Sequence, residues 1–313
     1  MKRSAAARRL VHAIIRSASS QPLTARRAFV SDGVCMQGVK QRSGWVENRP
    51  SRGFRALDVR ELWQYRELAL FLALRDLKVR YKQAAFGAAW AILQPIAGVV
   101  VFTLVFRRLA DMPSDGLPYP VFSYVGLSAW TYVSSGVTKA TQSLVANSAL
   151  VTKVYFPRIL APLAAVLPGL LDFGLSLILL LVIMPFFGVT PTWAIVTTPL
   201  WVMAAVLVVV AVGLWLGTLN VSYRDVGQGI ALAVQLWLFI SPIAYPTSSI
   251  DGPLRWVYAL NPVVAVVEGL RWALIGAPWP GDVVFVSFGV TLVLLAGGAA
   301  YFLRSERRFA DVI

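Results

Sequence analysis

The charge-free stretch in the middle of this chain constrains its fold most. No charged side chain occurs between Asp172 and Arg224. This interval is more than twice the roughly 20 residues that one helix needs to cross a hydrocarbon core of about 30 Å. In the whole chain 58% of the residues are hydrophobic and 14% are charged, too few polar side chains to cover a soluble globule. The sequence therefore predicts an all-α integral membrane protein.

Six apolar segments approach or exceed the length of a transmembrane helix. They run from about Ala85 to Phe106, Tyr119 to Val145, Ile159 to Phe187, Trp193 to Leu219, Gly229 to Tyr245 and Val283 to Leu303. Together they predict a six-span transmembrane domain over residues 85–303.

A further apolar stretch, from Ile250 to Gly276, does not fit this pattern. It contains charged and helix-breaking residues: Arg255, Asn261, Pro262, Glu268 and Arg271. Each charge would cost roughly 2.5–3.5 kcal/mol at the centre of a lipid-exposed span. We therefore expect two short re-entrant helices here. Six spans also return the C-terminal tail, residues 304–313, to the side of the N-terminus.

Basic residues concentrate ahead of the first span. Of the 29 Lys and Arg residues, 18 precede Gln83. The positive-inside rule then predicts that both termini are cytoplasmic. Residues 1–42 are expected to be a disordered basic extension, with a transit peptide as the alternative. Residues 43–84 form a cytoplasmic approach to the membrane.

The end of this approach has the pattern of an interfacial helix. Asp58 to Lys82 predicts one or two helices. One face is apolar, formed by Leu70, Leu74, Leu77 and Tyr81. Basic residues surround that face: Arg75, Lys78, Arg80 and Lys82. Such a helix lies in the plane of the membrane surface.

Motifs for several chemistries are missing from the sequence. The chain has no GxxxxGK[ST] phosphate-binding loop and no Gly-Lys pair, so we expect it not to hydrolyse ATP. One Cys and one His predict neither a disulfide nor a metal site. Asp172 is the acidic residue that lies deepest in the predicted spans. Two roles remain possible for it, coupling of transport to an ion and a hydrogen bond to a neighbouring helix.

The short stretch from Ser148 to Pro157 carries the apolar triplet Val154-Tyr155-Phe156 beside two basic residues, Lys153 and Arg158. We expect the triplet to be exposed on the isolated chain. Apolar side chains on a cytoplasmic loop need a cover. A partner protein and the lipid interface are equally good covers on physical grounds alone.

Five segments together resemble a known family. They are RDLKVRYKQAAFGAAWAILQP from Arg75, TKVYFPRIL from Thr152, LNVSYRD from Leu219, SPIAYP from Ser241 and LNPVVAVVEGLRWAL from Leu260. In this order they are similar to permease subunits of bacterial polysaccharide ABC exporters, most of all those that export O-antigen-type, lipid-linked glycans. The resemblance covers about Ser43 to Leu303.

The resemblance implies a type 2 ABC exporter: a homodimeric permease in the bacterial inner membrane, joined to two copies of a separate ATPase. ATP and Mg would be bound by that partner, and this chain would need no cofactor or nucleic acid. The cargo would be a polyprenyl-pyrophosphate-linked polysaccharide. The segment that docks on the ATPase would be a coupling loop, formed by Lys153, Val154, Tyr155, Phe156, Pro157 and Arg158.

Two groups of residues are candidates for contacts with the cargo. Aromatic rings stack on sugar faces, and those predicted to line a glycan channel are Tyr119, Tyr124, Trp130, Tyr132, Trp237, Phe239 and Tyr245. The alternative for them is an interfacial aromatic belt. The basic residues of the interfacial helix could bind the carrier pyrophosphate, with attraction to anionic lipid as the alternative.

Two other functions compete with O-antigen export. A capsular or teichoic-acid-type polymer could be carried by the same architecture. A membrane glycosyltransferase acting on a polyprenyl-linked sugar would need catalytic acids, and Asp111 and Asp115 lie on one short loop. A loop this short is a poor host for such a site.

Overall fold

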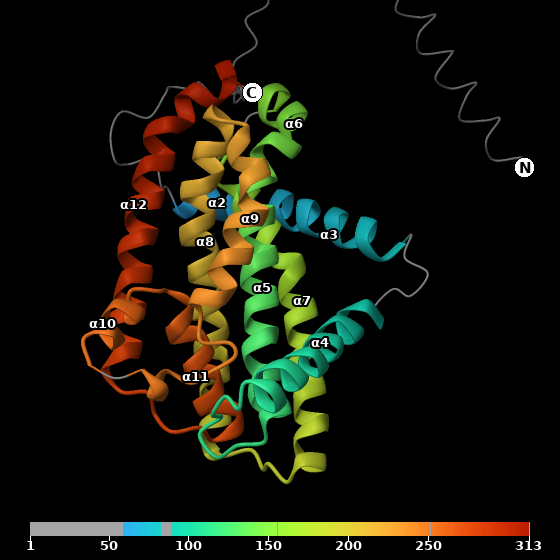
Figure 1. Ribbon diagram of the computed structural model, residues 1–313. Coiled ribbons are helices and arrows are strands. Elements are labelled where there is room, and N and C mark those ends of the chain that lie inside the picture. Colours follow the sequence, from blue (N-terminus) through green and yellow to red (C-terminus); the bar gives the residue numbers. More distant parts are fainter. Residues whose placement is uncertain (1–58, 83–88, 155, 251, 313) are drawn as a thin grey trace, which may run out of the picture. The chain divides into compact units, whose positions relative to one another are not determined.

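The computed structural model describes residues 59–82, 89–154, 156–250 and 252–312. Within these ranges the chain is helical and contains no strand (Figure 1). The long helices are α3 (Arg66–Lys82), α4 (Ala89–Phe102), α5 (Tyr119–Ala146), α7 (Leu160–Ile183), α8 (Thr198–Ser222), α9 (Asp225–Ile240), α11 (Val263–Ile275) and α12 (Asp282–Val312). The predicted extension, residues 1–42, and the start of the approach lie outside the described residues.

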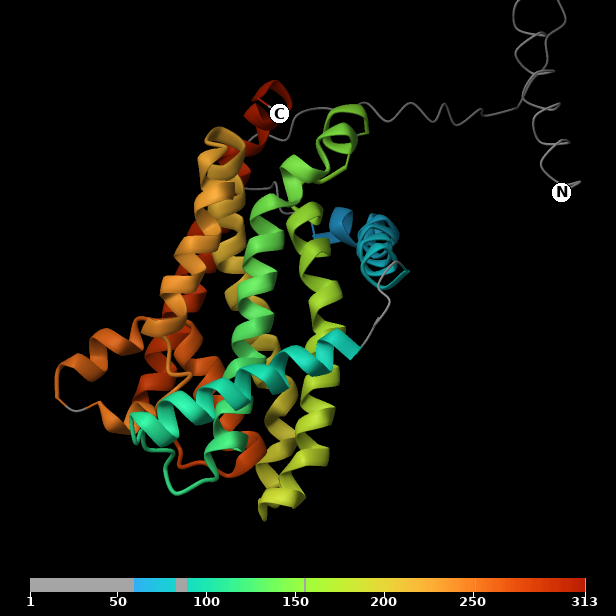
Figure 2. The same ribbon diagram turned by 45° about the vertical axis from the view of Figure 1, so that its right-hand side comes forward.

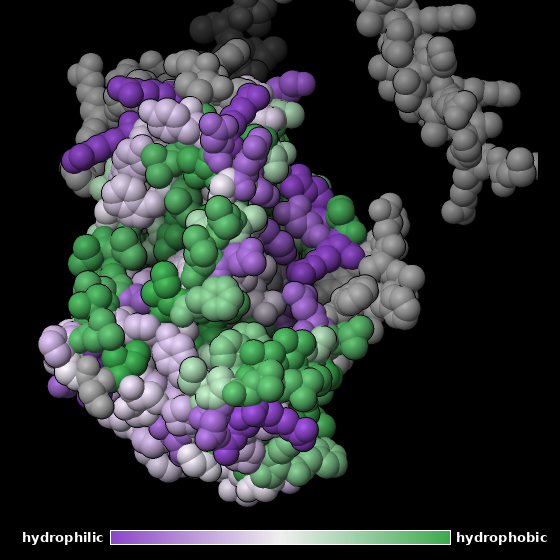
Figure 3. All heavy atoms as spheres, viewed as in Figure 1, coloured by the Kyte–Doolittle hydropathy of each residue, from purple (hydrophilic) through white to green (hydrophobic). Residues whose placement is uncertain are grey.

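Shorter elements connect these helices. They are α2 (Val59–Gln64), the π-helix η2 (Thr103–Leu109), α6 (Ser148–Lys153), the 3-10 turns η3 (Met184–Phe187), η4 (Trp193–Thr197) and η5 (Thr247–Ser249), and α10 (Leu254–Ala259). The described helices all belong to one unit, Ser51–Ile313. Hydrophilic side chains gather near α6 and the end of α12, and again along α3 (Figure 3).

Helix α5 lies at the centre of the bundle and packs against α4, α7, α8, α9 and α11 (Figures 1 and 2). Small residues let α5 and α8 approach closely. A Cβ added at Gly213 would lie 2.5 Å from the Cβ of Ala140, and one added at Gly136 would lie 2.8 Å from Val209. Backbone contact of this kind is the usual basis of helix packing in membranes, where dispersion replaces the hydrophobic effect.

Three described helical segments are long and apolar enough to cross a membrane: Leu160–Phe187, Trp193–Ser222 and Asp282–Glu306. Helix α9 is apolar but shorter. Helix α5 has 28 residues, but its many Ser and Thr side chains lower its hydropathy. Because neighbouring helices surround it, α5 does not need the apolar surface that a lipid-facing helix needs. Length and composition alone thus do not establish the predicted count of six spans.

The predicted break at Asn261 and Pro262 is confirmed, since α10 ends at Ala259 and α11 begins at Val263. The Asn261 side chain explains its local role. Its Oδ1 accepts hydrogen bonds from Trp237 Nε1 at 3.0 Å and from the backbone N–H of Val263 at 3.1 Å. Its Nδ2 donates to Ser241 Oγ at 3.0 Å. One amide therefore satisfies the start of α11 and ties it to the end of α9.

A buried ion pair fixes α11 to the loop after α9. Arg271 and Glu268 lie 3.3 Å apart, with side chains 0% and 4% exposed. Glu268 also accepts the backbone N–H of Thr247 at 3.0 Å, and Arg271 donates to the carbonyl of Ile243 at 2.9 Å. The guanidinium lies 3.6 Å from the ring centre of Phe122 on α5. The charges of Glu268 and Arg271 are thus enclosed by protein, as charges inside a membrane protein need to be.

One sequence prediction about helix geometry needs correction. The fifth apolar segment was expected to reach Tyr245, but α9 ends at Ile240. Pro242 forces the residue before it into an extended conformation, and Ser241 has φ −100° and ψ 151°.

Helix α3 packs inward through Leu72 and Ala73, while Leu70 and Leu74 of the predicted apolar face are exposed at 53% and 50%. That face is therefore open to a membrane.

Candidate functional site

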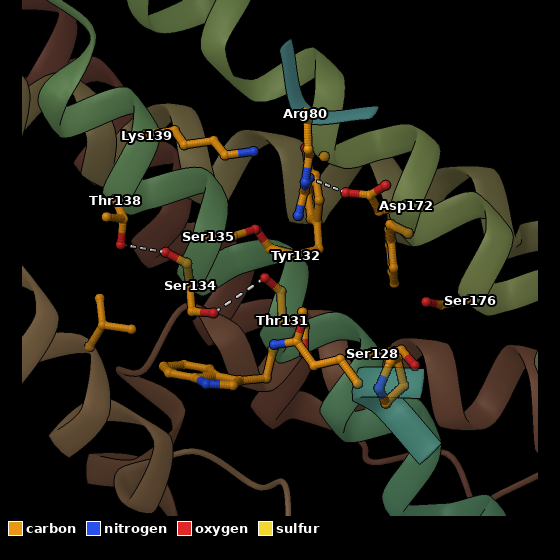
Figure 4. A pocket seen from close by; sticks show the side chains of 16 residues that line it. Arg80, Ser128, Thr131, Tyr132, Ser134, Ser135, Thr138, Lys139, Asp172 and Ser176 are labelled. Carbon is orange, nitrogen blue, oxygen red and sulfur yellow. Dashed lines mark hydrogen bonds and ion pairs between the residues drawn. The ribbon is translucent and has the colours of Figure 1, made fainter. Parts of the chain in front are cut away.

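A cavity of about 630 Å³ lies beside α3 in the described part of the chain. Helices α3, α4, α5, α7 and α9 contribute its walls. Most of the lining residues are polar or aromatic (Figure 4): Arg80, Gln94, Pro95, Ser128, Trp130, Thr131, Tyr132, Ser134, Ser135, Thr138, Lys139, Gly169, Asp172, Phe173, Ser176 and Val234. A polar cavity of this size among apolar helices indicates a binding or transport site.

Hydroxyl groups form one side of the cavity because they recur at helical spacing on α5. Thr131, Ser134, Ser135 and Thr138 follow one another at intervals of one, three or four residues, which places them on one face. Each donates to a carbonyl in the preceding turn; Thr131 to Leu127 at 2.7 Å and Thr138 to Ser134 at 2.8 Å are the shortest of these bonds. Their oxygens keep lone pairs that can accept hydrogen bonds from a ligand.

Charged groups gather where α3 covers the cavity. Arg80 of α3 forms an ion pair with Asp172 of α7, and Lys139 of α5 extends into the same space (Figure 4). Nearby, Arg75 of α3 donates to Asn147 Oδ1 at 2.9 Å and to Asp76 at 2.8 Å. The Arg80–Asp172 and Arg75–Asn147 contacts hold α3 against α7 and against the end of α5.

A smaller cavity of about 180 Å³ lies next to the first and shares Lys139 with it. Arg75, Asp76, Gln142 and Asn147 are among its lining residues. The half-buried Lys139 thus separates two polar spaces. Lys139 was not among the residues selected from the sequence, and the structure places it in α5, within the site.

Aromatic rings complete the wall of the larger cavity. Tyr132 stacks on Phe173 of α7, with ring centres 5.1 Å apart and an interplanar angle of 9°. Trp130 meets Trp237 of α9 edge to face at 5.6 Å. The Tyr132 side chain is 2% exposed, and its hydroxyl has no hydrogen-bond partner among the described residues. A ligand hydroxyl that reached this buried group would gain a hydrogen bond without displacing one.

The seven predicted channel aromatics do not form one surface. Trp130 and Tyr132 line the cavity, and Trp237 supports Trp130 from behind. Tyr119 and Tyr124 are buried, and the Tyr119 hydroxyl donates to the carbonyl of Ala244 at 2.8 Å. Phe239 is 62% exposed. Tyr245 is half-buried and bonds to the hydroxyl of Tyr258 at 2.7 Å.

The four basic residues predicted on α3 do not lie together at one cavity. Arg80 borders the larger cavity and Arg75 the smaller one. Lys78 is exposed. Lys82 lies at the end of α3, and its side chain is outside the described part. The row of hydroxyl side chains on α5 was not predicted from the sequence, although its spacing of three and four residues is the pattern of one helix face.

The predicted coupling loop is partly enclosed. Val154 is 48% exposed, but Phe156 is 3% exposed and belongs to the main hydrophobic core. The prediction that Phe156 is exposed is therefore wrong. Lys153 is exposed, Pro157 and Arg158 are half-buried, and residue 155 lies outside the described part.

The acids considered for glycosyltransfer have other contacts. Asp111 lies 3.3 Å from Arg107 in an exposed ion pair. Asp115 accepts a hydrogen bond from Ser248 at 2.6 Å. Both residues have positive φ angles, 47° and 52°, so they shape the turn between η2 and α5.

Comparison with known proteins identifies the family. Residues 67–275 match the ABC-2 type transporter family. The chain is 31% identical to the O-antigen export system permease protein RfbA of Myxococcus xanthus over 258 residues, covering 82% of this chain and 98% of that protein. An RfbA of Klebsiella pneumoniae is 25% identical over 79% of this chain and 95% of its own length. The polysialic acid transport protein KpsM of Escherichia coli is 27% identical over 72% and 85%.

These matches define the class of protein as a membrane-embedded transport subunit. The chain belongs to the ABC-2 type transporter family. The resemblance inferred from the five sequence segments is thereby confirmed.

Proposed function

We propose that this chain is the permease of an ABC exporter that moves a lipid-linked, O-antigen-like polysaccharide from the cytoplasmic to the outer side of the bacterial inner membrane. The observation that carries the proposal is the cavity beside α3, with hydroxyls, aromatic rings and cations within one space of about 630 Å³. Sugars need this combination of hydrogen-bonding groups and ring faces. Similarity to permeases named for O-antigen export supports the same cargo.

The topology proposed for this function has six spans and two cytoplasmic termini. Helix α4 with its continuation η2, and helices α5, α7, α8, α9 and α12, would cross the bilayer, with α3 in the interface. Helices α10 and α11 have 6 and 13 residues, or about 9 Å and 20 Å of length. They are separated from each other at Asn261 and Pro262, and α11 carries the charges Glu268 and Arg271. Neither would therefore cross a core of about 30 Å, and both would dip into the outer leaflet and return.

Energy would come from a separate ATPase, two copies of which would bind ATP and Mg and join a permease homodimer. Helix α6 and the exposed part of the coupling loop would form the docking element. Thr152, Lys153 and Val154 are exposed in succession, whereas Val151 is buried. The loop thus presents one side outward and anchors the other in the core.

The carrier pyrophosphate would meet the cations of α3. Arginine binds phosphate through two parallel hydrogen bonds, and Arg75 and Arg80 lie at the two cavities. Arg80 is 44% exposed despite its ion pair with Asp172, so a phosphate can approach it from the membrane surface.

Filling the cavity tests the proposal. Thr131→Leu combined with Ser135→Leu replaces two hydroxyls of the wall with larger apolar groups. We expect surface glycan to fall strongly and intracellular glycan to accumulate, measured in a strain lacking the chromosomal copy. Leu171→Phe is the matched control, because Leu171 is on α7 and 55% exposed. Normal surface glycan from a membrane-inserted double variant would contradict the proposal.

Export of a capsular or teichoic-acid-type polymer is the second candidate, favoured by the similarity to a polysialic acid transport protein. The two cargos differ in the sugar at the lipid end and in charge. Chemical analysis of the lipid-linked glycan that accumulates in a strain lacking this chain separates them.

A further inference from the structure

The C-terminal end of α12 extends beyond the membrane yet remains packed. The helix has 31 residues, about 46 Å of length, and therefore exceeds a core of about 30 Å by several turns. Near its end, Phe302 and Phe309 are 0% and 1% exposed. Their rings meet edge to face at 5.2 Å. This segment is thus part of the folded body.

Two reciprocal hydrogen bonds join this end of α12 to the coupling loop. The backbone N–H of Arg158 donates to Glu306 Oε1 at 3.1 Å. The guanidinium of Arg158 donates in turn to the backbone carbonyl of Glu306. Each residue contributes one backbone group and one side chain, which fixes both distance and orientation. We call this pair the loop clamp.

Apolar packing surrounds the loop clamp. Phe156 and Ile159, on either side of it in sequence, are 3% and 7% exposed. Both belong to the same hydrophobic core as Phe302 and Phe309. The inner side of the coupling loop is therefore held against the body, while the outer side, at Lys153 and Val154, stays open.

Helix α12 is itself firmly attached to α8. Trp215 of α8 donates its indole N–H to the carbonyl of Leu294 at 2.9 Å and stacks on Tyr301 at 5.2 Å. A Cβ added at Gly298 would lie 2.9 Å from Trp215 and 3.0 Å from the carbonyl of Ala211. A displacement of the end of α12 must therefore be passed along the α8 interface.

We infer that Glu306 is a positioning residue that makes the coupling loop and the end of α12 one mechanical unit. Movement of an ATPase docked on the loop then reaches the bundle by two routes, through α7 and through α12. The inference rests on the proposed function, because it requires an ATPase at the loop. It adds the α12 route, which is carried by the loop clamp.

Replacing the clamp acceptor tests the inference. Glu306→Ala removes the oxygen that receives the Arg158 N–H, whereas Glu306→Gln keeps a carbonyl oxygen at that place. We expect Glu306→Ala to bind the ATPase and hydrolyse ATP normally but to lose export several-fold. Glu306→Gln should export close to the unsubstituted level. Arg308→Ala is the control, since Arg308 is exposed on the same part of α12.

Three measurements on each variant, made on the whole transporter, separate the outcomes: ATPase co-purified with the permease, ATP hydrolysis by the purified complex, and surface glycan in the producing strain. Normal export by Glu306→Ala overturns the inference. Equal losses in the Ala and Gln variants also overturn it, because they would show that the charge, not the hydrogen bond, matters. If the unsubstituted chain binds no ATPase, the proposed function fails instead.

Discussion

Two ion pairs in this protein join the same kinds of group in opposite settings. Arg271 and Glu268, in the α11 region, have side chains 0% and 4% exposed. Arg80 and Asp172, between α3 and α7, have side chains 44% and 19% exposed and border a cavity of about 630 Å³. Packed protein surrounds the first pair, whereas the second pair faces a cavity.

The difference teaches what each pair is for. Arg271 also binds the carbonyl of Ile243 and lies on the ring of Phe122, so its removal would leave Glu268 buried without its charge partner. A buried charge without a partner is costly, whereas a partly exposed pair contributes little to stability. The α11 pair therefore stabilises the fold, whereas the α3 pair lies beside a cavity where a ligand can reach it.

The largest effect is expected from breaking the buried pair. Arg271→Ala should lower the free energy of unfolding by about 3–5 kcal/mol, because an uncompensated carboxylate is left in the interior. We expect little monodisperse protein in size-exclusion chromatography of detergent extracts. Arg255→Ala is the comparison, since Arg255 is half-buried and donates to the carbonyl of Pro280 at 2.9 Å. A fully stable Arg271→Ala would show that the pair is dispensable.

The helix that carries the buried pair should also tolerate an added side chain less well than the helix that carries Asp172. A Cβ added at Gly269 of α11 would collide with the ring of Trp201, whereas one added at Gly174 of α7 meets nothing within 4 Å. Gly269→Ala should cost about 1–3 kcal/mol of stability. Gly174→Ala should be neutral or stabilising by up to about 1 kcal/mol, because alanine favours the helix. Thermal unfolding of both variants in one detergent measures the contrast, and equal melting temperatures would contradict it.

The α3 pair should affect transport more than stability. Asp172→Asn should change stability by no more than about 1 kcal/mol but reduce export, because Arg80 loses the partner that holds its cation at the cavity. The exchanged pair, Arg80→Asp with Asp172→Arg, restores the contact and moves the cation from α3 to α7. We expect it to restore stability without restoring export, measured as surface glycan. Full recovery of export would show that the pair only holds α3 in place.

Local sequence signals predicted the helices well, and long-range packing explains the rest. The break at Asn261 and Pro262 was predictable because the amide and the proline act on their own backbone. The Arg80–Asp172 contact joins residues 92 positions apart, which no local pattern reveals. Phe156 was misjudged for the same reason, since α12 belongs to the core that encloses it.

The candidate site was predicted in part. Trp130 and Tyr132 were selected as aromatic residues and do line the cavity. Phe239 was selected by the same criterion but is 62% exposed. Ring chemistry alone cannot distinguish these positions, because the direction of each side chain depends on which helices lie beside it. Lys139 was missed because it is near the end of α5 in sequence but beside α3 in space.

The smallest effect, and the finest test of the comparison, concerns the Tyr132 hydroxyl. It is buried in the cavity wall without a hydrogen-bond partner among the described residues, so Tyr132→Phe should leave stability unchanged or slightly raised. If the cavity binds sugar hydroxyls, the variant should bind glycan about fivefold more weakly, the equivalent of one hydrogen bond of about 1 kcal/mol. Tyr301→Phe, outside the cavity and stacked on Trp215, should bind glycan normally. Titration of purified lipid-linked glycan into both variants measures this. Loss of stability without loss of affinity would instead show that Tyr132 is a structural residue. The wall of the cavity beside α3 would then serve packing, as the α11 region does.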